Sequence, residues 1–136
     1  SHEGAMTTCS ENQSCEPCGA AKAGKTWLIK QGVLFSRLLK IRWKRTGASF
    51  NLTGYGVRAY LRRNLFDASE PPLATCTCTI VDAATGQARV KLGATVTRGL
   101  YDRGFFDVEV YSLDDPDEVY RVLQGAFTVD LEATTV

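Results

Sequence analysis

The sequence has very few groups that titrate near neutral pH. Its single histidine is His2, which lies in the five residues before Met6, and these have the character of a tag remnant. Histidine is the side chain whose ordinary pKa lies closest to neutral, so a chain without a native histidine is a poor candidate for acid–base catalysis. We therefore expect a protein that is not an enzyme.

Long hydrophobic runs are absent as well. No run approaches the roughly 18 apolar residues of a membrane-spanning helix, and the first residues lack the apolar centre of a signal peptide. We therefore expect no membrane association. We also expect that the protein is made in a cytosol-like compartment. The 136 residues suit one domain with a core of ordinary size.

Charge is distributed unevenly between the two halves of the chain. Residues 1–66 carry 11 Lys or Arg against 3 Asp or Glu, whereas residues 67–136 carry 5 against 12. The net charge of +1 is therefore the sum of a basic first half and an acidic second half.

Residues 19–26 read GAAKAGKT and fit the phosphate-binding pattern G-x-x-x-x-G-K-[ST]. Such a loop holds phosphate only when a buried strand precedes it and a helix follows it. The preceding residues are polar and include Pro17, and the following residues alternate with period two. We therefore expect no nucleotide binding, with Lys25 at the edge of the first strand.

From Lys25 onward, short runs of alternating apolar and polar residues recur between turn residues, which is typical of a sandwich or barrel. They predict seven strands, at residues 26–31, 35–44, 55–63, 74–82, 87–92, 104–112 and 119–131. The side chains expected to face the core are Phe35, Leu39, Ile41, Trp43, Val57, Ala59, Leu61, Ala74, Cys76, Cys78, Ile80, Val90, Leu92, Phe106, Val108, Val110, Leu123, Phe127, Val129 and Leu131. Trp27 is expected in the core too.

The connections and the domain limits follow from the same pattern. Residues 82–87 are expected to form a hairpin turn in which Gly86 takes a positive φ, and residues 113–118 form another around Pro116. The segment 93–104 is expected to cross between sheets with a short helical turn, and NLT at 51–53 to be a turn. The predicted parts are a tag remnant and flexible, Cys-containing extension (1–24), a sandwich (25–132) and a C-terminal tail (133–136).

Three cysteines, Cys9, Cys15 and Cys18, lie in the polar extension. Thiolates two residues apart can chelate zinc, but three ligands are one short of the usual four. Incidental thiols and a disulfide formed after release from the cell are the alternatives. We predict no metal and no other cofactor.

Several segments resemble one known family. LTGY at 52–55, DAATGQARVKL at 82–92 and LQGAFTVD at 123–130 are similar to the immunoglobulin-like domain at the N-terminus of baseplate upper proteins of tailed phages and related prophage virion proteins. The resemblance covers about residues 25–132. It implies an all-β, immunoglobulin-like antiparallel β-sandwich of about seven strands. It also implies a structural protein of a virion, with other virion proteins and copies of itself as partners.

Two charged sets are the candidate interface of such a homo-oligomer. One is basic and lies on early strands, and the other is acidic and lies on late strands and their hairpin; the sets are Lys40, Arg42, Lys44, Arg58, Arg62 and Arg63, and Asp107, Glu109, Asp114, Asp115, Asp117 and Glu118. If the sets lie on opposite sides, a head-to-tail contact brings them together and can close a ring. The alternative is that they lie side by side and neutralise each other within one copy.

Other readings of these residues are weaker. Asp107 and Glu109 share one face of a strand, and we expect a solvated face rather than a catalytic pair. The basic strands could contact nucleic acid, but the acidic half opposes it, so no nucleic acid is expected. An alternative function is a carbohydrate or cell-surface binding module, which needs an exposed aromatic platform from Tyr60, Tyr101 and Tyr111.

Overall fold

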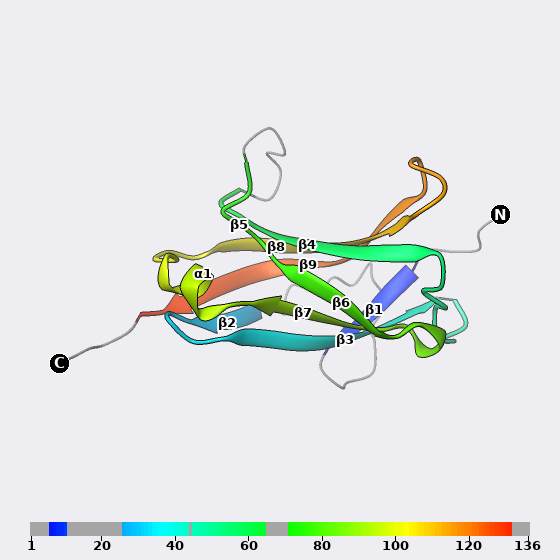
Figure 1. Cartoon of the computed structure of the whole chain (residues 1–136), viewed down its shortest axis with the longest axis horizontal. Coiled ribbons are helices and arrows are strands. Elements are labelled where there is room, and N and C mark those ends of the chain that lie inside the picture. The colour runs from blue at the N-terminus through cyan, green and yellow to red at the C-terminus, as the bar shows by residue number, and fades with distance from the viewer. Residues whose placement is uncertain (1–5, 11–25, 44, 65–70, 132–136) are drawn as a thin grey trace.

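The protein is a two-layer β structure with one short helix (Figure 1). The computed structural model describes residues 6–10, 26–43, 45–64 and 71–131. The strands are β1 (Met6–Ser10), β2 (Thr26–Lys30), β3 (Phe35–Trp43), β4 (Tyr55–Arg62), β5 (Ala74–Thr75), β6 (Thr77–Asp82), β7 (Gln87–Leu92), β8 (Gly104–Ser112) and β9 (Val119–Asp130). The 3-10 turn η2 (Ala83–Thr85) and the helix α1 (Ala94–Arg98) lie between strands.

The strands form two sheets that pack face to face (Figure 1). One sheet has the order β1-β3-β7-β6, and the other has the order β2-β9-β8-β4-β5. These orders match the ABED and GFC sheets of an immunoglobulin-like sandwich, with β2 added beside β9 and β5 beside β4. All neighbouring strands are antiparallel except β2 and β9, which are parallel. The predicted all-β sandwich is confirmed.

The strand limits agree with the sequence prediction to within a residue or two, with one exception. The predicted strand 74–82 is interrupted at Cys76, and its two parts pair in different sheets, β5 with β4 and β6 with β7. The chain therefore changes sheets at this residue, which a continuous alternation of apolar and polar residues does not reveal.

The N-terminal segment also differs from the prediction. Met6–Ser10, which the sequence assigns to a flexible extension, form β1 and pair antiparallel with β3. An edge strand takes its hydrogen bonds from the neighbouring backbone, so it needs no strong apolar alternation of its own. The rest of the predicted extension and the predicted tail 133–136 lie outside the described residues.

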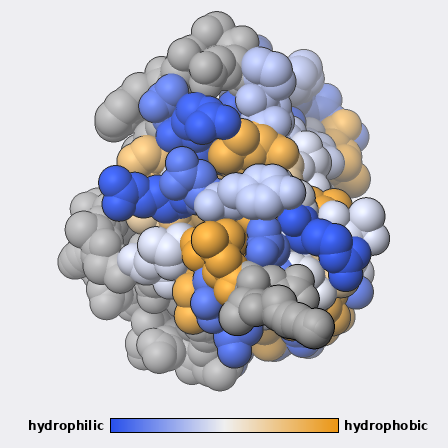
Figure 2. Space-filling view, turned by 90° about the vertical axis from the view of Figure 1, so that its left-hand side faces the viewer, coloured by the Kyte–Doolittle hydropathy of each residue, from blue (hydrophilic) through white to orange (hydrophobic). Residues whose placement is uncertain are grey.

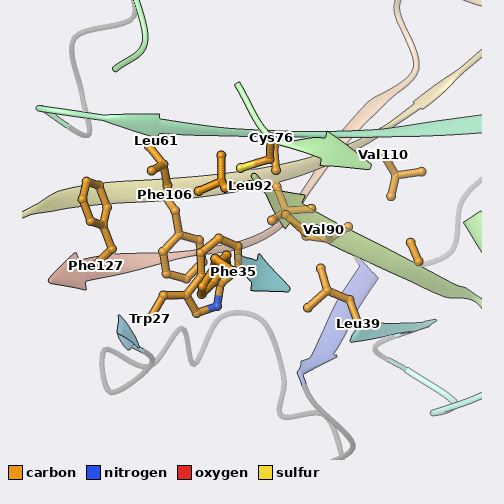
Figure 3. Packing of buried hydrophobic residues seen from close by; sticks show 14 of the residues in the cluster. Trp27, Phe35, Leu39, Leu61, Cys76, Val90, Leu92, Phe106, Val110 and Phe127 are labelled. Carbon is orange, nitrogen blue, oxygen red and sulfur yellow. The ribbon is translucent and has the colours of Figure 1, made fainter. Parts of the chain in front are cut away.

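The core lies between the two sheets (Figure 3). The Trp27 ring stacks on Phe106, with ring centroids 3.7 Å apart, and also contacts Phe35 at 5.1 Å. The predicted inward residues of β3, β4, β7 and β8 are buried or pack against this core. On β9 the alternation slips, because Val122 forms a bulge opposite Val108 and Glu109 and is buried. Leu131, predicted inward, is 54% exposed.

The predicted turns are present. Gly86 has a φ of 73° and closes the β6–β7 hairpin after η2. Residues 113–118 connect β8 and β9, and the backbone N–H of Ser112 donates to the carbonyl of Glu118 at 3.0 Å. The connection from β7 to β8 contains α1, as expected for residues 93–104. Asn51 Oδ1 accepts a hydrogen bond from the Thr53 N–H at 3.0 Å, which makes NLT a turn.

Candidate functional site

Charged side chains of both signs meet on the outer face of the five-stranded sheet. Antiparallel pairing places Arg58 of β4 beside Glu109 of β8, with Arg58 Nε 2.8 Å from Glu109 Oε1. Arg121 of β9 contacts the other oxygen of Glu109 at 3.4 Å, and Arg62 Nε lies 3.0 Å from Asp107 Oδ2. The requirement that the basic and acidic sets lie on opposite sides therefore fails for Arg58, Arg62, Asp107 and Glu109. These four neutralise each other within one copy.

Asp107 also corrects the expectation of a solvated acidic face. The residue is only 3% exposed, although its strand position points away from the main core. Its Oδ1 atom has no hydrogen-bond partner among the described residues, and neither has Oε1 of its cross-strand neighbour Gln124. The Arg62 guanidinium is therefore the main compensation for a buried carboxylate, and the pair is part of the structural framework.

The three tyrosines considered for a carbohydrate platform do not form one. The Arg58 guanidinium lies 4.7 Å from the centre of the Tyr111 ring, and that of Arg62 lies 5.1 Å from the Tyr60 ring. Each of these two rings thus already has a cation over one face. Tyr101 is 72% exposed, but it lies in the connection before β8 and not on the outer face of the sheet.

The remaining predicted interface residues are dispersed. Lys40 and Arg42 are half-buried on β3, Arg63 is exposed after β4, and Lys44 lies outside the described residues. The exposed carboxylates of the β8–β9 hairpin, by contrast, lie close together in the chain, and they are Asp114, Asp115 and Asp117. The described residues therefore include an acidic hairpin. The described basic side chains of the early strands do not form one continuous surface.

Glu118, at the end of that hairpin, has a structural role that the sequence did not indicate. Its Oε2 accepts hydrogen bonds from the hydroxyls of Tyr55 at 2.9 Å and Tyr120 at 2.8 Å. Burial, and then the hydrogen bond to Glu118, raise the pKa of Tyr120 to about 12 and also raise the pKa of Tyr55. Both rings contact Phe50, so the cluster closes one end of the core.

The described thiols are held in their protonated form. Burial raises the pKa of Cys76 to about 12 and that of Cys78 to about 11, and both cysteines are free. Protonated thiols are poor nucleophiles and poor metal ligands. Within the described segments no group of His, Cys, Asp and Glu could hold a metal ion. The Cys15 and Cys18 positions, and the side chain of Cys9, lie outside what the structure describes.

Two further expectations from the sequence, on the phosphate-loop pattern and on membrane-spanning helices, can be compared with the described residues. Residues 19–25 of the phosphate-loop pattern lie outside the described residues, but Thr26 begins β2, so a strand follows the pattern where a phosphate-binding loop needs a helix. None of the helices in the described part of the chain is long and apolar enough to cross a membrane.

Sequence reasoning missed an apolar surface at one end of the sandwich. Exposed apolar residues gather there from the β2–β3 turn, from α1 and from the segments next to β8 and β9; they are Val33, Leu34, Val96, Tyr101 and Leu131. Thr97 Oγ1 donates to the carbonyl of Val33 at 2.9 Å, and Gln31 Nε2 donates to that of Leu100 at 2.9 Å, which holds the turn against α1. Figure 2 views this end and shows hydrophobic surface among hydrophilic residues. We call it the apolar end.

A sequence signal for the apolar end exists. Val33 and Leu34 are adjacent apolar residues directly after Gly32, in a turn where polar residues are usual.

Comparison of the chain with protein-family models and with curated protein sequences gives no match to either.

Proposed function

We propose that this chain is a non-enzymatic structural protein of a tailed-phage or prophage particle, where it docks onto copies of itself or onto a larger virion protein. The observation that carries the proposal is where the residues of the resemblance lie in the fold. In LTGY, Leu52 is buried and Gly54 has a φ of 87°; in DAATGQARVKL, Gly86 and Val90 hold the turn and the core. In LQGAFTVD, Phe127 is fully buried. The motifs of the resemblance therefore lie at turns and core positions, which supports the proposal.

The chemistry of the described side chains supports a structural role. The carboxylates of Asp107 and Glu109 are engaged by arginines, and the thiols of Cys76 and Cys78 are kept protonated. A catalytic acid, base or nucleophile instead needs a group that can lose or gain a proton near the working pH. The charged groups on the outer face of the five-stranded sheet pair with one another within one copy, so the proposal assigns contact with partners to the ends of the sandwich.

The experiment that tests the proposal is to locate the protein. Particles from a bacterial culture that produces the protein are purified through a density gradient, and the protein is quantified in them and then located by electron cryo-microscopy. We expect a fixed copy number relative to the major capsid protein and density for the sandwich at a symmetric position. Recovery of the protein only from the particle-free fraction would refute the proposal.

A further inference from the structure

The two ends of the sandwich differ in chemistry and are held apart by the length of a strand. Tyr101 and Arg103 directly precede β8, and the acidic hairpin directly follows it. A nine-residue strand spans about 30 Å, so these segments lie at opposite ends of the molecule, as Figure 1 shows for α1 and the β8–β9 hairpin.

Among the described residues, the apolar end carries an excess of exposed cations. They come from the last residues of β2 and β7, from the residue after β4, from α1 and from the segment before β8; they are Lys30, Lys91, Arg63, Arg98 and Arg103. The exposed carboxylates at this end, within the residues that the structure describes, are Asp102 and Asp130. A neighbour that fits this end must therefore combine apolar and acidic side chains.

The hairpin end has this combination. Leu113 is 64% exposed and stands next to Asp114, Asp115 and Asp117, and Val119 is also exposed. The described cations at this end are Arg42 and Arg45, which are fewer than the described carboxylates.

The hairpin is also held in one conformation. Ser112 Oγ accepts hydrogen bonds from the N–H groups of Asp114 and Asp115 at 3.1 Å, and Asp115 Oδ1 accepts one from the Asp117 N–H at 3.0 Å. A preformed hairpin loses little conformational entropy when it binds.

We propose that copies of this chain associate end to end, with the β8–β9 hairpin of one copy seated on the apolar end of the next. This inference rests on the proposed function, in which the domain docks onto copies of itself, and it names the two surfaces that meet. A contact between two apolar ends, or between two hairpins, would bring like charges together, which is unfavourable. The contact is therefore heterologous, and successive copies form a ring or a row.

The test uses charge reversal at exposed positions, with the full chain as parent. One variant carries Asp114→Lys and Asp117→Lys in the hairpin, a second carries Arg98→Glu and Arg103→Glu at the apolar end, and a third carries all four changes. A control carries Thr79→Lys, on the exposed side of β6 and away from both ends of the sandwich. Association is measured by sedimentation at protein concentrations up to about 1 mM, at about 0.05 and 0.5 M salt, after circular dichroism has shown that each variant is folded.

We expect the parent and the control to associate, and the association to weaken at the higher salt because exposed charges are screened. Each single-end variant should associate at least about tenfold more weakly, whereas an equimolar mixture of the two, and the four-change variant, should recover association because their charges are again complementary.

Three results would overturn the inference: a parent that stays monomeric, single-end variants that associate like the parent, or a four-change variant that does not recover. None of these results bears on whether the protein is found in particles, so the failure of this contact and the failure of the proposed function remain distinguishable.

Discussion

At the scale of single residues, Arg62 and Asp107 form an ion pair with little access to water. Their side chains are 17% and 5% exposed, and Asp107 Oδ1 has no hydrogen-bond partner among the described residues. Arg62→Met removes the compensating charge and leaves the carboxylate buried, so we expect the free energy of unfolding to fall by about 3 kcal/mol. Urea denaturation of the variant and the parent measures this change.

The partner substitution separates a lost charge from lost packing. Asp107→Leu in addition to Arg62→Met removes both charges, and we expect most of the lost stability to return, because apolar replacements of buried ion pairs are often neutral. A double variant as unstable as Arg62→Met alone would contradict this account. For the same reason, reversing the charge of Arg62 is a poor probe of assembly, because it also lowers the stability of the sandwich.

Glu118 and its two tyrosines predict a loss of stability in alkali. The pKa of Tyr120 is about 12 in the folded chain, against an ordinary value of 10.0, so the unfolded chain loses this proton first as the pH rises. The stabilisation is complete below pH 10 and is lost between about pH 10 and 12. Denaturation midpoints measured across this range should fall less in a Tyr55→Phe, Tyr120→Phe variant than in the parent.

Tyr101→Phe is the control, because Tyr101 is exposed and lies in the connection before β8. It should leave the alkaline loss of stability unchanged. If the Tyr55→Phe, Tyr120→Phe variant loses as much stability as the parent over the same pH range, the two hydroxyls are not its source.

At the scale of elements, the β6–β7 hairpin depends on Gly86. Its φ of 73° is unfavourable for other residues, and a Cβ there would lie 2.8 Å from the carbonyl oxygen of Phe50 and also against that of Ile41. Since backbone atoms cannot move aside easily, we expect Gly86→Ala to lower the free energy of unfolding by more than the roughly 1–3 kcal/mol of backbone strain alone. Thermal denaturation would measure it.

Gly54→Ala is the matched comparison for this prediction. Gly54 has a φ of 87°, but a Cβ there meets no atom within 4 Å, so it isolates the strain of the backbone from the close contact. The prediction fails if the two substitutions destabilise the protein equally.

The elements show why much of the fold could be predicted. Strands that bury one face alternate with period two, and this pattern located β2, β3, β4, β7, β8 and β9. The turn residues around Gly86 and Pro116 located two hairpins by their local conformational preferences.

What could not be predicted depends on pairing between distant strands. The bulge at Val122 shifts the alternation of β9 by one residue, and β1 owes its place to hydrogen bonds with β3. The burial of Asp107 needs the register of β4 with β8, which brings Arg62 within reach. The sequence therefore predicted which residue types the candidate site contains, but not which of them lie together. The hairpin carboxylates are an exception, because they are neighbours in sequence.

At the scale of the whole molecule, charge is arranged along the long axis rather than between two sheet faces. Each sheet contains strands from both halves of the chain, so the charges of β4 and β8 cancel where these strands are neighbours. Among the described residues, exposed cations gather toward the end that contains α1, and exposed carboxylates gather in the β8–β9 hairpin.

The parallel pairing of β2 with β9 determines how the domain responds to tension. Thr26 lies beside Ala126 and Lys30 beside Asp130, so a pull on the chain before β2 and after β9 slides the two strands in opposite directions. All five paired positions then carry load at once, whereas a pull between Asp102 and Asp130 opens the β8–β9 pair one position at a time. Optical-tweezers measurements should give a higher unfolding force in the first direction, and equal forces would argue against this mechanism. In the proposed particle, the β2–β9 pair would therefore resist tension between the segments joined to these two strands.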